Sequence, residues 1–149
     1  MTTAIKKTSD LTISNYVMGF MFSCLIFGFL SIGIASAATP GAIGGDFTNK
    51  QYSIKGDWSI EQRGDQQVIT FNEKFKTKNG PDLKVFLSPK SIDQVTGKNA
   101  TDGSALVAVL QNNRGAQEYV LPAGIDINNY GSLLIHCEQY SVLWGGANL

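Results

Sequence analysis

The chain has 149 residues, a formal net charge of zero at pH 7 and a hydrophobic content of 43%. Acidic and basic side chains are interspersed after residue 37, so no basic stripe follows a phosphate backbone and nucleic acid is a poor candidate partner. The length of the remainder suits one domain with one core.

The N-terminal segment, residues 1–37, has the layout of a secretory signal peptide. Two lysines precede an almost unbroken apolar run at residues 17–35, and Ala-Ser-Ala ends it at Ala37. The run exceeds the roughly 7–15 residues usual in a signal peptide and reaches the roughly 17–25 that span a bilayer. We expect cleavage after Ala37, with an uncleaved membrane anchor as the alternative. Either outcome places residues 38–149 outside the cytoplasm, in a secreted or periplasmic location.

Cys24 lies inside this apolar run and does not mark a lipoprotein. Bulky residues precede it where a lipidation signal needs small ones, and it stands in the middle of the run. We interpret Cys24 as an apolar residue of the targeting segment, residues 38–43 as a tether and residues 44–149 as the folded domain.

The domain alternates short apolar segments with turn residues, a pattern that predicts strands. No segment has a sustained apolar period of 3.6 residues. About eight such strands predict an all-β fold, an antiparallel β-sandwich or a small barrel. We expect strands within residues 58–62, 67–75, 83–88, 105–111, 116–122, 132–139 and 140–146, and an edge strand within 44–56.

Three segments carry more specific expectations. Residues 88–103 are polar and rich in breakers, which predicts a long excursion with at most one helical turn. Residues 105–111 form a continuous apolar run, typical of a strand buried on both faces or of a short helix. Gly145 and Gly146 stand where side chains must be absent. The aromatic residues of the expected strands are core candidates before they are a binding platform: Trp58, Phe71, Phe86, Tyr119, Tyr140 and Trp144.

Cys137 is the candidate functional residue. In a strand, Cys137 shares one face with Leu133 and Ile135, which is a core-like position. A free cysteine packs well as a small hydrophobe, so a buried, inert thiol is one interpretation. A redox thiol is the other, because an odd cysteine in an exported protein is unusual. Reactivity would need a neighbouring cation or an amide-rich turn, and the sequence shows neither.

His136 is expected to act separately from Cys137, because adjacent strand residues point to opposite faces. A lone histidine beside Glu138 is more typical of a surface or half-buried position than of a metal ligand. The sequence contains no two-thiol zinc pattern, no haem-attachment motif and no nucleophile elbow. We therefore expect no metal, no cofactor and no stand-alone enzyme. A metal or haem bound by Cys137 with ligands from other strands is the alternative.

Two stretches carry a family resemblance: FKTKNGPDLKVFLSPKS, residues 75–91, and LVAVLQNNRGAQEYVLPAGIDINNYGSLLIHCEQYSVLWGGANL, residues 106–149. The order G-P-D-L, K-V-F-L-S, G-x-Q-x-Y-x-L-P and a terminal I-x-C-x-x-[YF]-x-V-x-[WF]-G-x-A-x-L resembles the DM-thirteen domain, often labelled an electron-transfer domain. The resemblance runs from about Gly44 to the C-terminus.

The resemblance implies a role for Cys137, which occupies the position of the family's single C-terminal cysteine. The preceding residue is commonly aromatic in the family, so His136 is not implied in a shared mechanism. In larger animal proteins of the Skeletor type the domain accompanies DOMON and b-type cytochrome modules. The sequence shows neither module, so the electron donor is expected on another protein.

Two functions follow as expectations. The first is an extracytoplasmic redox module that acts through Cys137 on a protein partner. The alternative is a non-enzymatic interaction domain of the cell envelope or cell surface, in which Cys137 is a buried core residue. Membrane contact is expected only through residues 17–35, if they are retained.

Overall fold

The computed structural model describes residues 42–149. The expected signal peptide or anchor lies outside the described residues, as does most of the expected tether. No helix among residues 42–149 has the length and apolar character needed to cross a bilayer.

The described part confirms the all-β prediction: it consists of antiparallel sheets and two single-turn 3-10 helices. Its elements are β1 (Ile43–Asp46), β2 (Thr48–Asn49), β3 (Ile54–Lys55), β4 (Asp57–Arg63), β5 (Gln66–Phe71), β6 (Lys76–Thr77), β7 (Leu83–Ser88), η1 (Ile92–Gln94), β8 (Ala105–Val109), β9 (Gln117–Val120), η2 (Ile127–Asn129), β10 (Ser132–Cys137) and β11 (Val142–Asn148).

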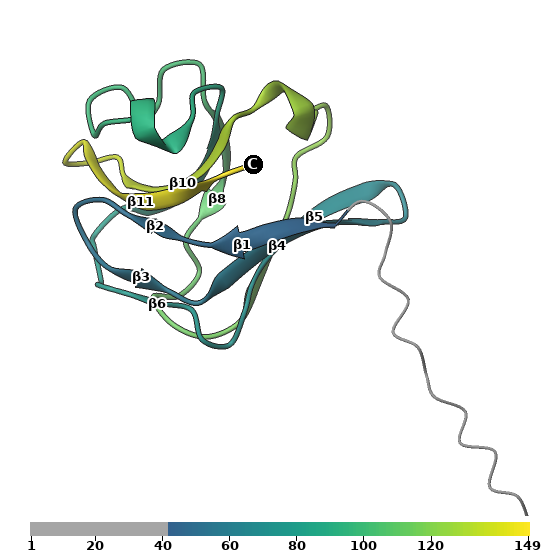
Figure 1. The fold of residues 1–149 in the computed structure, drawn as a ribbon, viewed down its shortest axis with the longest axis horizontal. Coiled ribbons are helices and arrows are strands. Elements are labelled where there is room, and N and C mark those ends of the chain that lie inside the picture. Colours follow the sequence, from purple (N-terminus) through teal and green to yellow (C-terminus); the bar gives the residue numbers. More distant parts are fainter. Residues whose placement is uncertain (1–41) are drawn as a thin grey trace, which may run out of the picture. The chain divides into compact units, whose positions relative to one another are not determined.

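The strands form two main sheets that face each other (Figure 1). One sheet has the order β1-β4-β5-β9, and the other has the order β2-β11-β10-β7-β8. The short pair β3-β6 forms a third sheet. Three of the strands have only two residues, so the number of longer strands agrees with the expected eight.

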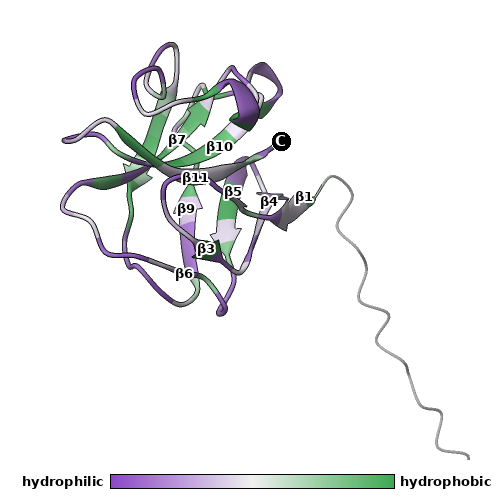
Figure 2. Cartoon of the chain, turned by 60° about the vertical axis from the view of Figure 1, so that its left-hand side comes forward, coloured by the Kyte–Doolittle hydropathy of each residue, from purple (hydrophilic) through white to green (hydrophobic). Residues whose placement is uncertain are grey.

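The core between the main sheets includes the side chains that strand alternation predicted for β5 and β7. Ile69 and Phe71 enter it from β5, and Leu83, Val85 and Leu87 enter it from β7. All five are 6% exposed or less. In Figure 2, β7 and β10 are coloured largely as hydrophobic. Alternation therefore assigned these residues to the correct face.

A second apolar cluster covers the opposite face of the β10 sheet. The excursion at residues 88–103 folds back over this face and places Ile92, Val95 and Ala100 against Phe86, Leu134 and Leu143. The backbone N–H of Ile92 donates to Asn148 Oδ1 at 2.8 Å. The single helical turn expected in the excursion is η1, but its packing onto the sheet was not predicted. The consequence is that every residue of β10 is buried.

The interpretation of residues 105–111 was wrong, because β8 is an edge strand. Leu106 is 48% exposed and Val109 is 61% exposed, so the strand is not buried on both faces. Val107 has no partner in the register with β7 and turns into the core. This apolar run therefore forms an edge strand with a β-bulge, and only one face of the strand is covered.

Candidate functional site at the end of β10

Cys137 is the last residue of β10 and is 0% exposed. It lies in the same cluster as Leu133 and Ile135, which confirms its predicted face. Its cross-strand neighbours are Leu83 of β7 and Val142 of β11. Both neighbours are aliphatic, so neither supplies the positive charge that would activate a thiol.

Trp144 lies two residues after Val142, the β11 partner of Cys137, and packs on the loop at residues 78–82. Ile135 pairs with Gly145 and His136 pairs with Leu143, so Trp144 is an additional, bulged residue of β11. The bulge directs the indole into the inter-sheet core. The indole N–H donates to the Lys78 carbonyl at 3.1 Å. A Cβ built on Gly80 would lie only 2.9 Å from the indole ring, so the loop packs directly on Trp144.

His136 lies on the other face of β10 and is 2% exposed, so the expected surface or half-buried position was wrong. The excursion that covers this sheet face explains the difference. The Phe86 ring lies 6.1 Å from the imidazole, and Nδ1 has no hydrogen-bond partner. Burial lowers the pKa of His136, and Lys84 also lowers it, against opposing effects of Glu138, the Val142 backbone and Asp82. Burial therefore disfavours the protonated imidazolium relative to an exposed histidine.

Cys137 and His136 do not form a joint site. Strand alternation separates them as predicted, and the bulge lies on β11, leaving the β10–β7 register regular. Among residues 42–149, no three His, Cys, Asp or Glu side chains converge as metal ligands.

An ion cluster holds the turn that follows Cys137. Lys84 Nζ lies 3.3 Å from Asp82 Oδ1 and also contacts the Glu138 carboxylate, and the hydrogen bond with Glu138 raises the pKa of Lys84. The backbone N–H of Gln139 donates to Asp82 Oδ2 at 3.1 Å. Asp82 of the G-P-D-L stretch thus ties the turn to β7.

A surface hollow of about 170 Å³ lies beside this end of the core. Residues 79–83 and 109–113 line it. Leu83 belongs to this lining and is also the cross-strand neighbour of Cys137. One side chain is therefore shared by a solvent-facing hollow and the surroundings of the thiol.

The G-x-Q-x-Y stretch forms a buried polar network. Gln117 is 5% exposed, and its Oε1 accepts from the Tyr119 hydroxyl at 2.6 Å and from the Asn112 N–H at 3.1 Å. Its Nε2 donates to the Asn112 carbonyl at 3.0 Å. The Tyr119 oxygen accepts from the Gln111 N–H at 3.1 Å. This motif therefore fixes the 111–115 loop on β9.

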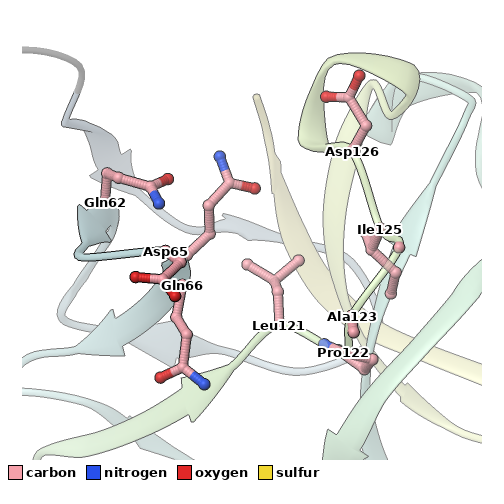
Figure 3. A pocket seen from close by; sticks show the side chains of 10 residues that line it. Gln62, Asp65, Gln66, Leu121, Pro122, Ala123, Ile125 and Asp126 are labelled. Carbon is pink, nitrogen blue, oxygen red and sulfur yellow. The ribbon is translucent and has the colours of Figure 1, made fainter.

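A larger hollow of about 400 Å³ lies between the β4–β5 hairpin and the turn at residues 121–126. Figure 3 shows Gln62, Asp65 and Gln66 on one side and Pro122, Ala123 and Ile125 on the other. Its glutamine and aspartate side chains are mostly exposed, so it offers hydrogen-bonding groups without a desolvated polar centre.

Of the predicted aromatic core residues, Trp58, Phe71, Phe86, Tyr119 and Trp144 are buried. Tyr140 is 64% exposed, so its assignment to the core was wrong. The last strand begins at Val142, and Tyr140 lies in the turn before it.

A family model described as Electron transfer DM13 matches residues 46–149. The match includes Cys137, the loop that packs on Trp144 and the Gln117 network. Neither the curated proteins nor the solved structures contain a match to the chain.

Proposed function

The chain belongs to the Electron transfer DM13 family, and from this membership we propose that residues 44–149 form an extracytoplasmic, electron-transfer-associated module that works by docking and not as a stand-alone enzyme. Within this module we assign Cys137 to the core. The location outside the cytoplasm is supported by the signal-peptide or anchor pattern of residues 1–37.

The complete burial of Cys137 carries the proposal for the thiol. The side chain is 0% exposed between aliphatic neighbours, and a partner could not contact its sulfur while the core is closed. Reactive cysteines are partly exposed and lie in electropositive surroundings, whereas buried structural cysteines are inert.

A redox thiol at Cys137 is the second candidate, and the thin cover at this end of β10 favours it. Val142 is only half-buried, and Glu138, next to Cys137, is exposed. If the end opened, the Cys137 thiolate could attack a partner disulfide. The partner's S–S bond would break, a mixed disulfide would form, and the partner's second sulfur would leave as a thiolate.

Thiol labelling against urea separates the two candidates. The full chain would carry Cys24→Ser, so that Cys137 is its remaining cysteine, and would be labelled with Ellman's reagent at increasing urea concentrations. For a core cysteine, labelling requires global unfolding, so the opening free energy and its urea slope equal those of unfolding. Adding Cys137→Ser gives the unlabelled control, and Tyr140→Cys in that background gives the rate of an exposed thiol.

Fast labelling without urea, or an opening free energy far below that of unfolding with a shallow urea slope, would overturn the assignment of Cys137 to an inert core. It would favour the redox thiol instead. The docking proposal concerns a different surface and is tested separately below.

A further inference from the structure

A row of three cations crosses three neighbouring chain segments at the short sheet. Lys55 of β3 pairs with Lys76 of β6, and Lys76 pairs in turn with Arg114. Residues that are directly opposite in a sheet project from the same face. All three side chains are exposed. The cation row, Lys55–Lys76–Arg114, therefore presents three positive charges on one surface.

The two ends of this row are held close to its centre by backbone pairing. The Thr77 N–H donates to the Asn113 carbonyl at 2.9 Å, and the Gly115 N–H donates to the Phe75 carbonyl at 2.8 Å. These bonds flank the Lys76–Arg114 pair, which makes it a non-hydrogen-bonded pair, the kind in which opposed side chains are closest. Like charges in such positions destabilise a sheet.

No carboxylate of the described residues neutralises the cation row. Within residues 42–149, the salt bridges involve Lys50, Arg63, Lys84 and Lys90, and none involves the row. Lys78 lies two residues after Lys76 and is a fourth exposed cation. It too has no salt bridge within residues 42–149. The fold thus retains a local repulsion that a single acidic residue would relieve.

A groove with an apolar wall adjoins the row. Its volume is about 370 Å³, and it is lined by Tyr52, Ser53, Thr77, Lys55, Lys76 and Lys78. The cation row, Lys78 and this groove together are called the patch below. Lys78 Nζ lies 4.7 Å from the centre of the Tyr52 ring, which lies 4.2 Å from that of Trp144. Tyr52 therefore gives the groove an aromatic surface beside three positive charges.

The patch also adjoins the hollow beside the Cys137 end of the core. Lys78 directly precedes residues 79–83, and Arg114 directly follows residues 109–113. These two segments line the hollow that contains Leu83. The backbone on which the cation row lies is therefore continuous with the two segments that line the hollow.

We propose that the cation row and the Tyr52 groove dock an acidic segment of a partner protein, whose carboxylates flank an apolar side chain. The proposal deepens the docking function proposed above and rests on it. Charge complementarity supports this occupant, since electron-transfer encounters are small interfaces steered by charge. The aromatic surface of Tyr52 favours a peptide with an apolar side chain over a uniform polyanion or a lipid headgroup layer, neither of which offers an apolar group to the groove.

Fluorescence anisotropy with a fluorescein-labelled Glu-Glu-Phe-Glu-Glu peptide tests the proposal on the full chain in nonionic detergent. Binding should weaken strongly between about 10 mM and about 150 mM salt, as the Debye length falls from about 30 Å to about 8 Å. Each of Lys55→Gln, Lys76→Gln and Arg114→Gln should weaken binding about two- to fivefold. Lys98→Gln is the matched control, because Lys98 is exposed, has no salt bridge within residues 42–149 and lies outside the patch; it should change nothing. Replacing the peptide's Phe by Ser should also weaken binding.

Three results would overturn the proposal. The first is that Lys98→Gln weakens peptide binding as much as the row variants do. The second is that replacing the peptide's Phe by Ser leaves the affinity unchanged. The third is that polygalacturonate or phosphatidylglycerol vesicles bind more tightly than the peptide and that this binding depends on the row. None of these results alters the thiol-labelling outcome, so failure of the docking site and failure of the Cys137 assignment are distinguishable.

Discussion

Replacing Cys137 by Ser and by Ala tests whether the thiol occupies a sealed apolar position. Cys137 is 0% exposed, and its cross-strand neighbours are Leu83 and Val142. Serine keeps most of the volume but places a hydroxyl among aliphatic groups, which costs about 1–3 kcal/mol. Alanine adds no polar group but loses the packing of the sulfur and leaves a small cavity, which costs roughly 1–2 kcal/mol.

Urea unfolding followed by tryptophan fluorescence measures both variants, because Trp58 and Trp144 are each 5% exposed in the folded core. We expect both variants to be less stable than the wild type, with Ser at least as destabilising as Ala and an unchanged urea slope. Gln139→Ser, at an exposed position of the neighbouring turn, is the control and should stay within about 0.5 kcal/mol of the wild type.

A Ser variant that is clearly more stable than the Ala variant would refute the reasoning, because it would reveal a polar partner for the residue 137 side chain. A Ser variant as stable as the wild type would refute it as well. Binding of the acidic peptide should be the same in both variants, since Cys137 lies outside the cation row.

Three further predictions concern the rest of the domain. His136→Phe should reduce the loss of unfolding free energy as pH falls below about 6.5. The pKa of His136 is lower in the folded state than in the unfolded chain, so on acidification the unfolded chain takes up the proton first. The free energy of unfolding that is present above the unfolded-state pKa is therefore lost as the pH falls. An unchanged pH profile of the variant in urea titrations would contradict this. Gln117→Leu should cost about 2 kcal/mol or more in urea unfolding, because it strands the Tyr119 hydroxyl and the Asn112 N–H, and it should cost less in a Tyr119→Phe background. Gly146→Ala should cost about 1–3 kcal/mol, since the new Cβ would lie 2.2 Å from the Leu133 carbonyl oxygen, whereas Gly45→Ala meets no atom within 4 Å and should cost clearly less thermal stability than Gly146→Ala.

Strand alternation was predictable because the face of a strand residue depends on local backbone geometry. It assigned Leu133, Ile135 and Cys137 to one side of β10 and separated His136 from the thiol. The steric need for glycine at Gly145 and Gly146 was also predicted, and a Cβ at Gly145 would lie 2.5 Å from the Thr48 carbonyl oxygen.

Burial on the second face of a strand was not predictable in the same way. Whether that face meets solvent depends on which distant segment covers it. The 88–103 excursion packs on Leu134, on the sheet face to which His136 also belongs, but leaves Leu106 of β8 exposed, although the run around Leu106 is more continuously apolar. Tyr140 was misassigned because the last strand begins two residues later than its alternation suggested.

The sequence by itself determined the all-β class, the inward residues of the main strands and, through its ordered motifs, membership of the Electron transfer DM13 family. The tertiary structure alone decided that the thiol and the imidazole are both sealed, and that Lys55, Lys76 and Arg114 form one row. The physical reason is the range of the interactions: alternation is set between adjacent residues, whereas cover and cross-strand pairing depend on segments that meet only when the sheets assemble.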